Sequence, residues 1–179
     1  MKPTIWSACT LTVLLMLVSN TVSIAQDDML SVNIAIPEHH NHRSLNSTDH
    51  FHVLITNKSD DAVRLWSDRY SWGYDNLFFE IVDEGGMVIG TISKKPRGWD
   101  KNFPDWLSIK PGESYVLNVD FFSEQGRKIW ENVPTLKRGT KPHLVKLRAV
   151  YEVKPDEQSR KLDIWTGKII SSVGTYAIW

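Results

Sequence analysis

The sequence predicts an all-β protein, a single antiparallel β-sandwich of immunoglobulin-like type. Apolar residues alternate with polar ones in several short segments, which is typical of strands with one buried face. Clusters of Gly, Pro, Asn and Asp separate these segments at the places where a sandwich needs turns. No segment keeps a 3.6-residue apolar period. Together these patterns indicate roughly eight strands in two packed layers, with a closed barrel as the competing arrangement.

The first strands follow from period-two alternation in the amino-terminal half of the mature chain. Apolar side chains share one face in three segments: Leu30, Val32, Ile34 and Ile36; Phe51, Val53 and Ile55; and Leu77, Phe79 and Ile81. A short apolar segment over residues 62–66 lies between the last two of these. Each segment has the length and the alternation expected of a half-buried strand.

The later strands are predicted in the same way. Tyr115, Leu117, Val119 and Phe121 alternate with polar residues, and residues 143–153 form the longest alternating segment. A final core strand is expected around Trp165 and Ile169, with Gly167 between them. Residues 173–179 are expected either to pair with a sheet edge or to stay mobile. Residues 155–161 fit one short helical turn.

Turn residues divide these strands and leave long connections between some of them. Residues 83–86, Asp-Glu-Gly-Gly, predict a hairpin that leads to Met87, while residues 57–61 and 110–113 predict further turns. Long connections are expected over residues 67–76, 94–105 and 122–142. Long ordered loops are where proteins of this class carry function.

The first 25 residues are typical of a secretory signal peptide. Lys2 precedes an apolar run from Leu11 to Val18, and Ser23 and Ala25 stand at the positions that signal peptidase reads. The run is shorter than the roughly 20 apolar residues that a membrane span needs. We therefore expect residues 1–25 to be removed, and an exported protein that is periplasmic or extracellular and not inserted in a membrane after cleavage.

The remaining chain, residues 26–179, has the size and composition of one folded domain. Removing 25 residues from the 179-residue chain leaves 154, enough for a full core. Cys9 is the only cysteine and lies in the leader, so packing and not disulfides must hold the domain together. Acidic and basic residues nearly balance, which argues against nucleic acid as a partner. The expected partner is an unknown protein or glycan.

Candidate catalytic and metal-binding residues are sparse. His50 and His52 share one strand face, and the loop His39–His42 could add an imidazole, but metal sites need three or four convergent ligands. The competing interpretation places His50 and His52 on a wet strand face. The mature chain has no thiol and no Gly-x-Ser-x-Gly motif. We therefore expect no enzyme activity, no metal and no cofactor.

Two aromatic loops are the best candidates for a binding site. The segments "SDRYSWGYDN" and "RGWDKNFPDW" combine aromatic rings with Asp, Asn and Arg side chains. Such combinations suit sugar rings, and they equally suit a protein interface. The candidate ligand-binding residues are Tyr70, Trp72, Tyr74, Trp99, Asn102 and Trp106. In the competing interpretation, which the burial tendency of Trp favours, Trp99, Phe103 and Trp106 turn inward and cap the sandwich, and Tyr70 and Tyr74 remain a contact surface.

Five blocks carry a resemblance to a known group of proteins: "SWGYDNLFFEI", "RGWDKNFPD", "IKPGES", "LRAVYEV" and "IWTGKIIS". In these blocks the chain resembles a family of secreted bacterial proteins of immunoglobulin-like sandwich fold without an assigned activity. The resemblance covers nearly all of residues 26–179 and implies fold and export. More remotely, "IKPGES", Trp130 and "AVYEV" are similar to the bacterial intracellular proteinase inhibitor family, although no inhibitory loop can be matched residue by residue.

These observations favour an exported, non-catalytic binding or interaction domain whose ligand is a carbohydrate or a protein. The alternative is a proteinase inhibitor of immunoglobulin-like fold.

Overall fold

The computed structural model describes residues 29–36, 38–39, 42–45, 50–134 and 142–178. Strands dominate these residues, and every paired strand is antiparallel to its neighbour. The all-β prediction is therefore confirmed. The helices in this part of the chain are all too short to cross a membrane. The expected signal peptide, residues 1–25, lies outside the described residues.

The smaller of the two main sheets has three strands in the order β1 (Leu30–Ala35), β4 (Phe51–Asn57) and β9 (Ser114–Val119). β4 is the central strand, and its odd-numbered residues are buried while its even-numbered ones are half-buried. This is the alternation that the sequence predicted for a strand with one face on the core. The predicted strand that ended at Phe121 stops earlier, at Val119.

The larger sheet is built around β11 (His143–Val153). On one side β11 pairs with β6 (Leu77–Val82), and a hairpin joins β6 to its other neighbour, β7 (Val88–Lys94). The short β10 (Trp130–Glu131) pairs with the outer edge of β7. On its other side β11 pairs with β12 (Gly167–Ile170) and then with β13 (Gly174–Ile178). Ser171 joins the two, because it exchanges backbone and side-chain hydrogen bonds of 2.9 Å with Ala149. The trailing segment therefore pairs with β11, as one of the two predicted options.

Short elements complete the chain. β5 (Val63–Trp66) pairs with β8 (Trp106–Ile109), and β2 (Glu38–His39) pairs with β3 (His42–Arg43). The helices are α1 (Ser71–Tyr74), α2 (Glu124–Ile129) and α3 (Glu157–Lys161). α3 confirms the predicted helical turn and begins with a capping box between Asp156 and Ser159. α1 and α2 lie inside segments that were predicted as irregular connections.

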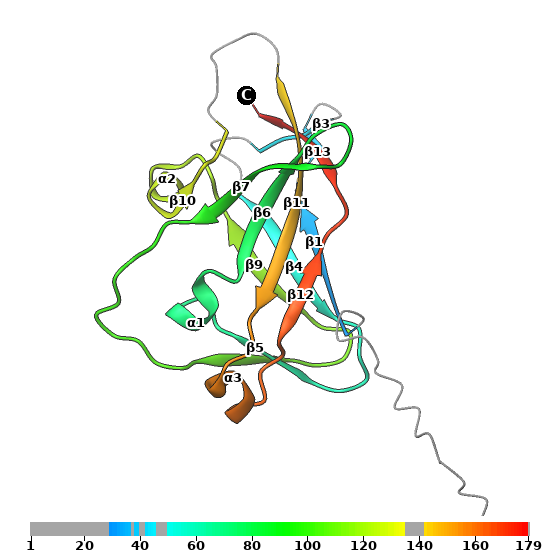
Figure 1. Ribbon diagram of the computed structural model, residues 1–179. Helices are drawn as coiled ribbons and strands as arrows, with labels where there is room; N and C mark the ends of the chain where they lie inside the picture. The colour runs from blue at the N-terminus through cyan, green and yellow to red at the C-terminus, as the bar shows by residue number, and fades with distance from the viewer. Residues whose placement is uncertain (1–28, 37, 40–41, 46–49, 135–141, 179) are drawn as a thin grey trace, which may run out of the picture.

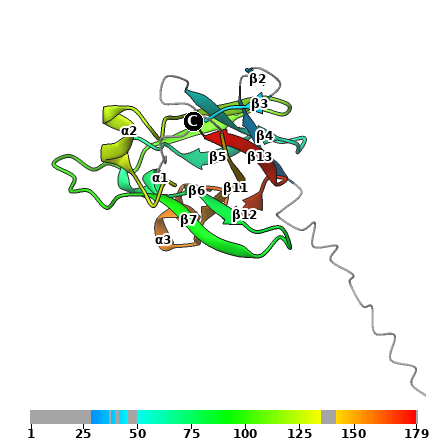
Figure 2. The same ribbon diagram turned by 90° about the horizontal axis from the view of Figure 1, so that it is seen from above.

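The core lies between the two main sheets, which stand face to face in Figures 1 and 2. Phe51 of β4 meets Phe79 of β6 edge to face, with ring centroids 5.8 Å apart. Phe121 lies 5.1 Å from both of these rings, and Trp130 completes the cluster. Each fully buried ring of this size contributes about 1.5–3 kcal/mol. Aromatic packing thus joins the two sheets where no disulfide is possible.

Asn57, at the end of β4, fixes the position of the β5–β8 pair. Its side chain is fully buried, and its amide donates to the backbone oxygens of Asp61 at 2.7 Å and Ile109 at 2.9 Å. Its carbonyl oxygen accepts from the backbone and hydroxyl of Ser59. A buried amide is stable only with such partners. These bonds hold β8 against the smaller sheet. They thereby also position Trp106 of β8 and Trp66 of its partner strand β5.

Candidate functional site

The two aromatic loops that the sequence singled out lie against each other. Residues 67–76 precede β6 and residues 95–105 follow β7, so the β6–β7 hairpin brings them to the same end of the sheet (Figure 1). Ser71 and Asn102 form two hydrogen bonds, of 3.1 Å from the Ser71 backbone N–H and 2.7 Å to the Ser71 hydroxyl. Arg69 pairs with Asp105 at 2.8 Å. These contacts hold the loops together.

Two pairs of aromatic rings also connect the two loops. Tyr70 meets Phe103 with centroids 6.1 Å apart, and Tyr74 meets Trp99 at 5.4 Å, both nearly perpendicular. The Arg97 guanidinium lies 3.9 Å above the centre of the Trp99 ring. Edge-to-face pairs and cations above rings each add to simple burial. The loop over residues 95–105 is therefore packed against α1.

Gly73 permits the tight turn that shapes α1. A β-carbon at this position would lie 2.2 Å from the backbone oxygen of Ser67 and 2.6 Å from its carbonyl carbon. Such distances are far inside van der Waals contact, so only glycine allows the chain to pass this close. The turn is closed by the backbone N–H groups of Gly73 and Tyr74, which both donate to the Tyr70 oxygen.

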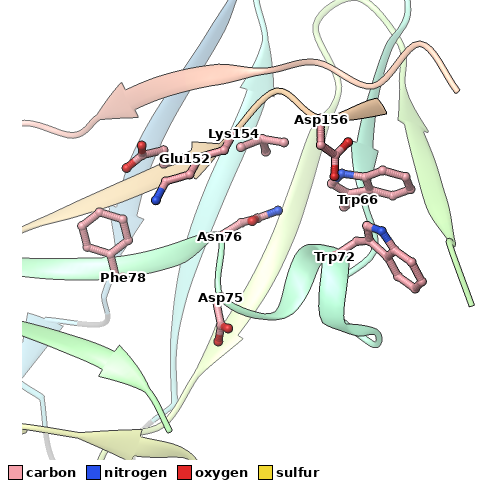
Figure 3. A pocket seen from close by; sticks show the side chains of 9 residues that line it. Trp66, Trp72, Asp75, Asn76, Phe78, Glu152, Lys154 and Asp156 are labelled. Atoms are coloured by element: carbon pink, nitrogen blue, oxygen red, sulfur yellow. The ribbon is translucent and has the colours of Figure 1, made fainter. Parts of the chain in front are cut away.

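A cleft of about 320 Å³ opens beside α1 (Figure 3). Trp66 and Trp72 line one end, with ring centroids 6.1 Å apart and planes inclined by 38°. The remaining lining combines two apolar residues with charged and amide side chains: Phe78, Val153, Asp75, Asn76, Glu152, Lys154 and Asp156. In Figure 3 Asp156 lies next to the two indole rings, and Lys154 reaches toward Phe78 at the other end. We call this site the Trp66–Trp72 cleft.

Burial shifts the pKa values of two charged side chains in and beside the cleft, Asp75 and Lys94. Partial burial raises the pKa of Asp75, and the nearby Lys94 ammonium opposes this shift. Burial lowers the pKa of Lys94, while Asp68 and Asp75 act in the opposite direction. The Lys94 ammonium also lies 4.6 Å above the Tyr74 ring. Lys94 therefore interacts both with Asp75, which lines the cleft, and with Tyr74 of the packed loops.

Two tyrosines lie beneath these loops. The Tyr115 hydroxyl donates a 2.8 Å hydrogen bond to Asp68, and burial together with the Asp68 carboxylate raises the Tyr115 pKa. Tyr151 is 2% exposed, and burial raises its pKa as well. Both hydroxyls are thus held neutral at physiological pH. The Tyr115 hydroxyl gives the loop over residues 67–76 a polar but uncharged support.

The structure separates the six predicted site residues. Trp72 lines the cleft, Asn102 ties the loops together, and Tyr70 and Trp99 are half-buried in ring pairs. Tyr74 is only 7% exposed, so the expectation that it belongs to a contact surface is wrong. Its ring is covered by Trp99 and the Arg97 guanidinium, and α1 turns it inward.

The capping interpretation also needs correction. Trp106 is 41% exposed and Phe103 is 58% exposed, so neither turns inward. In β8, Ile109 and the half-buried Leu107 occupy the inward face, which leaves Trp106 on the outer one. Only Trp99 fits the capping expectation in part, because it packs on Tyr74.

Sequence reasoning missed most of the cleft. Trp66 was predicted only as the last residue of a short strand, and it is 2% exposed while still lining the opening. Asn76, Glu152 and Asp156 come from three different elements or their ends, and no motif links them. Only the pairing of β6 with β11, which sets Leu77 opposite Tyr151, brings Asn76 and Glu152 together.

His50 and His52 are the histidines for which the competing interpretation predicted a solvent-facing strand position. His52 lies on β4, and His50 lies just before it. His52 Nδ1 donates a 2.8 Å hydrogen bond to the Asn118 side-chain oxygen, and His50 lies 3.8 Å from Asp120. In the part of the chain that the structure describes, no three histidine, cysteine or acidic side chains come together as metal ligands would. His40 lies outside the described residues.

Neither a protein-family model nor a curated protein matches this chain. The resemblances to secreted sandwich proteins and to the proteinase inhibitor family therefore stay predictions from the sequence.

Proposed function

We propose that this protein is an exported, non-catalytic binding domain of immunoglobulin-like sandwich fold, and that its ligand enters the Trp66–Trp72 cleft. The two face-to-face antiparallel sheets support the sandwich, and the leader-like residues 1–25 support export. The single observation that carries the binding role is the cleft itself. It places two neighbouring indole rings beside carboxylate and amide side chains.

This combination suits a saccharide. The apolar faces of sugar rings pack on aromatic side chains, while hydroxyl groups donate to carboxylates and accept from amides. The cleft volume of about 320 Å³ lies at the small end of ligand sites, which are about 300–1,000 Å³. A mono- or disaccharide unit of a longer glycan is therefore the favoured ligand, and an aromatic or polar side chain of a protein partner is the other.

Thermal unfolding in the presence of an oligosaccharide panel tests this proposal. A ligand at one hundred times its dissociation constant stabilises the protein by about 2.7 kcal/mol. For a chain of this size that raises the melting temperature by about 5–11 °C. Trp72→Ala should abolish the shift, because Trp72 lines the cleft.

Phe103→Ala is the control. Phe103 is also an exposed aromatic residue of the two aromatic loops, at 58%, but it does not line the cleft. Trp106 is less suitable, because it lies directly opposite the cleft residue Trp66 in the β5–β8 pair. The Phe103→Ala variant should keep the full ligand-induced shift. If no saccharide shifts the melting temperature, or if Phe103→Ala abolishes the shift as completely as Trp72→Ala, the cleft is not a saccharide site.

Proteinase inhibition is the second candidate, and the loop over residues 95–105 favours it. This loop extends outward around α1 (Figure 1), and Phe103 on it is 58% exposed. A large apolar side chain on a held loop is the kind of anchor that a protease specificity pocket accepts. Stoichiometric loss of protease activity, relieved by Phe103→Ala, would support inhibition; unchanged activity across a protease panel would exclude it for those enzymes.

A further inference from the structure

The Trp66–Trp72 cleft carries more negative than positive charge. Its lining holds three carboxylates, those of Asp75, Glu152 and Asp156, and one ammonium group, that of Lys154. Lys94 lies outside the lining and opposes the charge of Asp75. Within the described part of the chain, none of the four lining groups forms a salt bridge. A ligand that enters the cleft therefore meets an excess of carboxylates without ion-pair partners.

Asp156 is the carboxylate at the aromatic end of the cleft, next to the two indole rings (Figure 3). Its position is fixed, because one carboxylate oxygen accepts the backbone N–H of Ser159 at 2.6 Å in the capping box of α3. The other oxygen has no hydrogen-bond or ion-pair partner among the residues that the structure describes. That oxygen is available to a ligand.

The cations near the cleft lie at its other end. Lys154 reaches toward Phe78 there, and the Lys168 ammonium group lies 5.7 Å from the centre of the Phe78 ring. By contrast, no described lysine or arginine lies over the ring of Trp66 or Trp72. The aromatic end of the cleft thus combines a fixed carboxylate with indole rings and has no cation of its own.

An indole ring beside a free carboxylate favours a cationic group. The face of an aromatic ring attracts cations, tryptophan most strongly, and the attraction grows where the cation is withdrawn from water. The protein itself uses this interaction close by, since the Arg97 guanidinium lies 3.9 Å from the centre of the Trp99 ring. An ammonium group can also donate charge-assisted hydrogen bonds to a carboxylate. At the aromatic end of the cleft both interactions must come from the ligand.

We infer that the ligand of the cleft is an amino sugar with a free ammonium group, which lies between the Trp72 ring and the Asp156 carboxylate. This inference rests on the proposed saccharide-binding function and adds the charge of the ligand to it. Trp72 is half-buried while Trp66 is only 2% exposed, so the sugar ring packs on Trp72. An N-acetylated sugar has lost the positive charge and offers Asp156 a weaker partner.

Oligosaccharides of glucose, N-acetylglucosamine and glucosamine, equal in length and linkage, test this inference. They differ only at the second carbon of each sugar ring, which carries a hydroxyl group, a neutral amide or an ammonium group. At a pH of about 6 the glucosamine amines are protonated and carboxylates are ionised. In isothermal titration calorimetry the glucosamine oligosaccharide should bind about tenfold more tightly than the other two, a difference of about 1.4 kcal/mol.

Two variants locate the origin of this preference. Asp156→Asn removes the charge and keeps the fold, because asparagine caps a helix about as well as aspartate does. In this variant the preference for glucosamine should disappear. Glu157→Gln is the matched control: it removes the same charge from the next residue, which is exposed and does not line the cleft, and should keep the full preference. Circular dichroism checks that both variants fold.

The outcomes separate this inference from the function on which it rests. If the glucose or the N-acetylglucosamine oligosaccharide binds as tightly as the glucosamine one, the cleft is a saccharide site and the inference alone is wrong. If none of the three binds, the proposed saccharide function fails with it. A preference that survives Asp156→Asn, or that Glu157→Gln removes equally, would also overturn the inference.

A lysine with blocked amino and carboxyl ends separates the two sources of an ammonium group. This probe has the ammonium group but no sugar ring, so it should bind far more weakly than the glucosamine oligosaccharide. Binding of equal strength would assign the ammonium group to a side chain of a protein partner and would overturn the amino sugar.

Discussion

Replacing Gly73 with alanine tests how α1 is built. The added β-carbon would lie 2.2 Å from the Ser67 oxygen, and contacts of this kind are not tolerated below about 3.0 Å. The two backbone segments must therefore separate by about 0.8 Å or the turn must open. Both segments are backbone, so no flexible side chain can move aside. The strain falls directly on the turn that carries Trp72.

The magnitude follows from opposing effects. Overpacking of this kind costs about 1–3 kcal/mol, and the upper end applies because backbone meets backbone. Alanine restricts the unfolded chain and so returns about 0.4–1 kcal/mol. The net loss for Gly73→Ala is about 2 kcal/mol, which lowers the melting temperature by about 4–8 °C. At Gly98 an added β-carbon meets nothing within 4 Å, so Gly98→Ala should be neutral or slightly stabilising.

Urea unfolding followed by tryptophan fluorescence measures both variants against the unaltered protein. The midpoint for Gly73→Ala should fall with little change in slope, while that for Gly98→Ala should stay or rise. Equal stability of the two variants would show that the close passage between Gly73 and Ser67 does not exist, and the shape of the Trp66–Trp72 cleft would then need revision.

Three further predictions concern charge and capping. Because burial raises the pKa of Asp75, the folded state binds the Asp75 proton more tightly than the unfolded state does. The free energy of unfolding should therefore fall as pH rises from the unfolded-state pKa of Asp75 through its folded-state pKa. Asp75→Asn should remove this fall, which a series of melting temperatures over pH would measure. Arg148→Ala should lower the free energy of unfolding in urea by about 2 kcal/mol, since it leaves the largely buried Glu80 carboxylate without its 2.7 Å partner. Combining Arg148→Ala with Glu80→Gln should recover part of this loss. If the losses of the two single variants simply add in the double variant, this reasoning is wrong. Asp156→Ala removes the capping box of α3 and should cost about 1 kcal/mol, whereas a variant as stable as the unaltered protein would show that the cap is unimportant.

The strands could be predicted because their signal is local. In β11, alternation alone identified all of residues 143–153, and the Asp-Glu-Gly-Gly turn identified the hairpin after β6. α1 could not be found this way, since four residues are too few to show a helical period. Trp106 was misjudged for a different reason. Its size favoured burial, but Leu107 and Ile109 already occupied the inner face of β8.

The candidate site was predictable only in part. That the two aromatic loops meet follows from the hairpin, because an antiparallel hairpin brings its two ends together. The cleft does not follow, since the pairing of β6 with β11 brings Asn76 to Glu152, and Trp66 comes from the separate β5–β8 pair. Side-chain direction decided the remainder: Tyr74 and Tyr70 are four residues apart, yet α1 turns only Tyr74 into the interior.

The bonds between Ser71 and Asn102 join residues 31 apart and lie at the surface. During folding they can close only after β6 and β7 have paired, because the hairpin lies between them. The same exposure makes them early to break, so amide protons of residues 71–76 should exchange with solvent through a local opening while those of β11 exchange only on global unfolding. Because Trp72, Asp75 and Asn76 line the cleft, a bound ligand would slow that exchange.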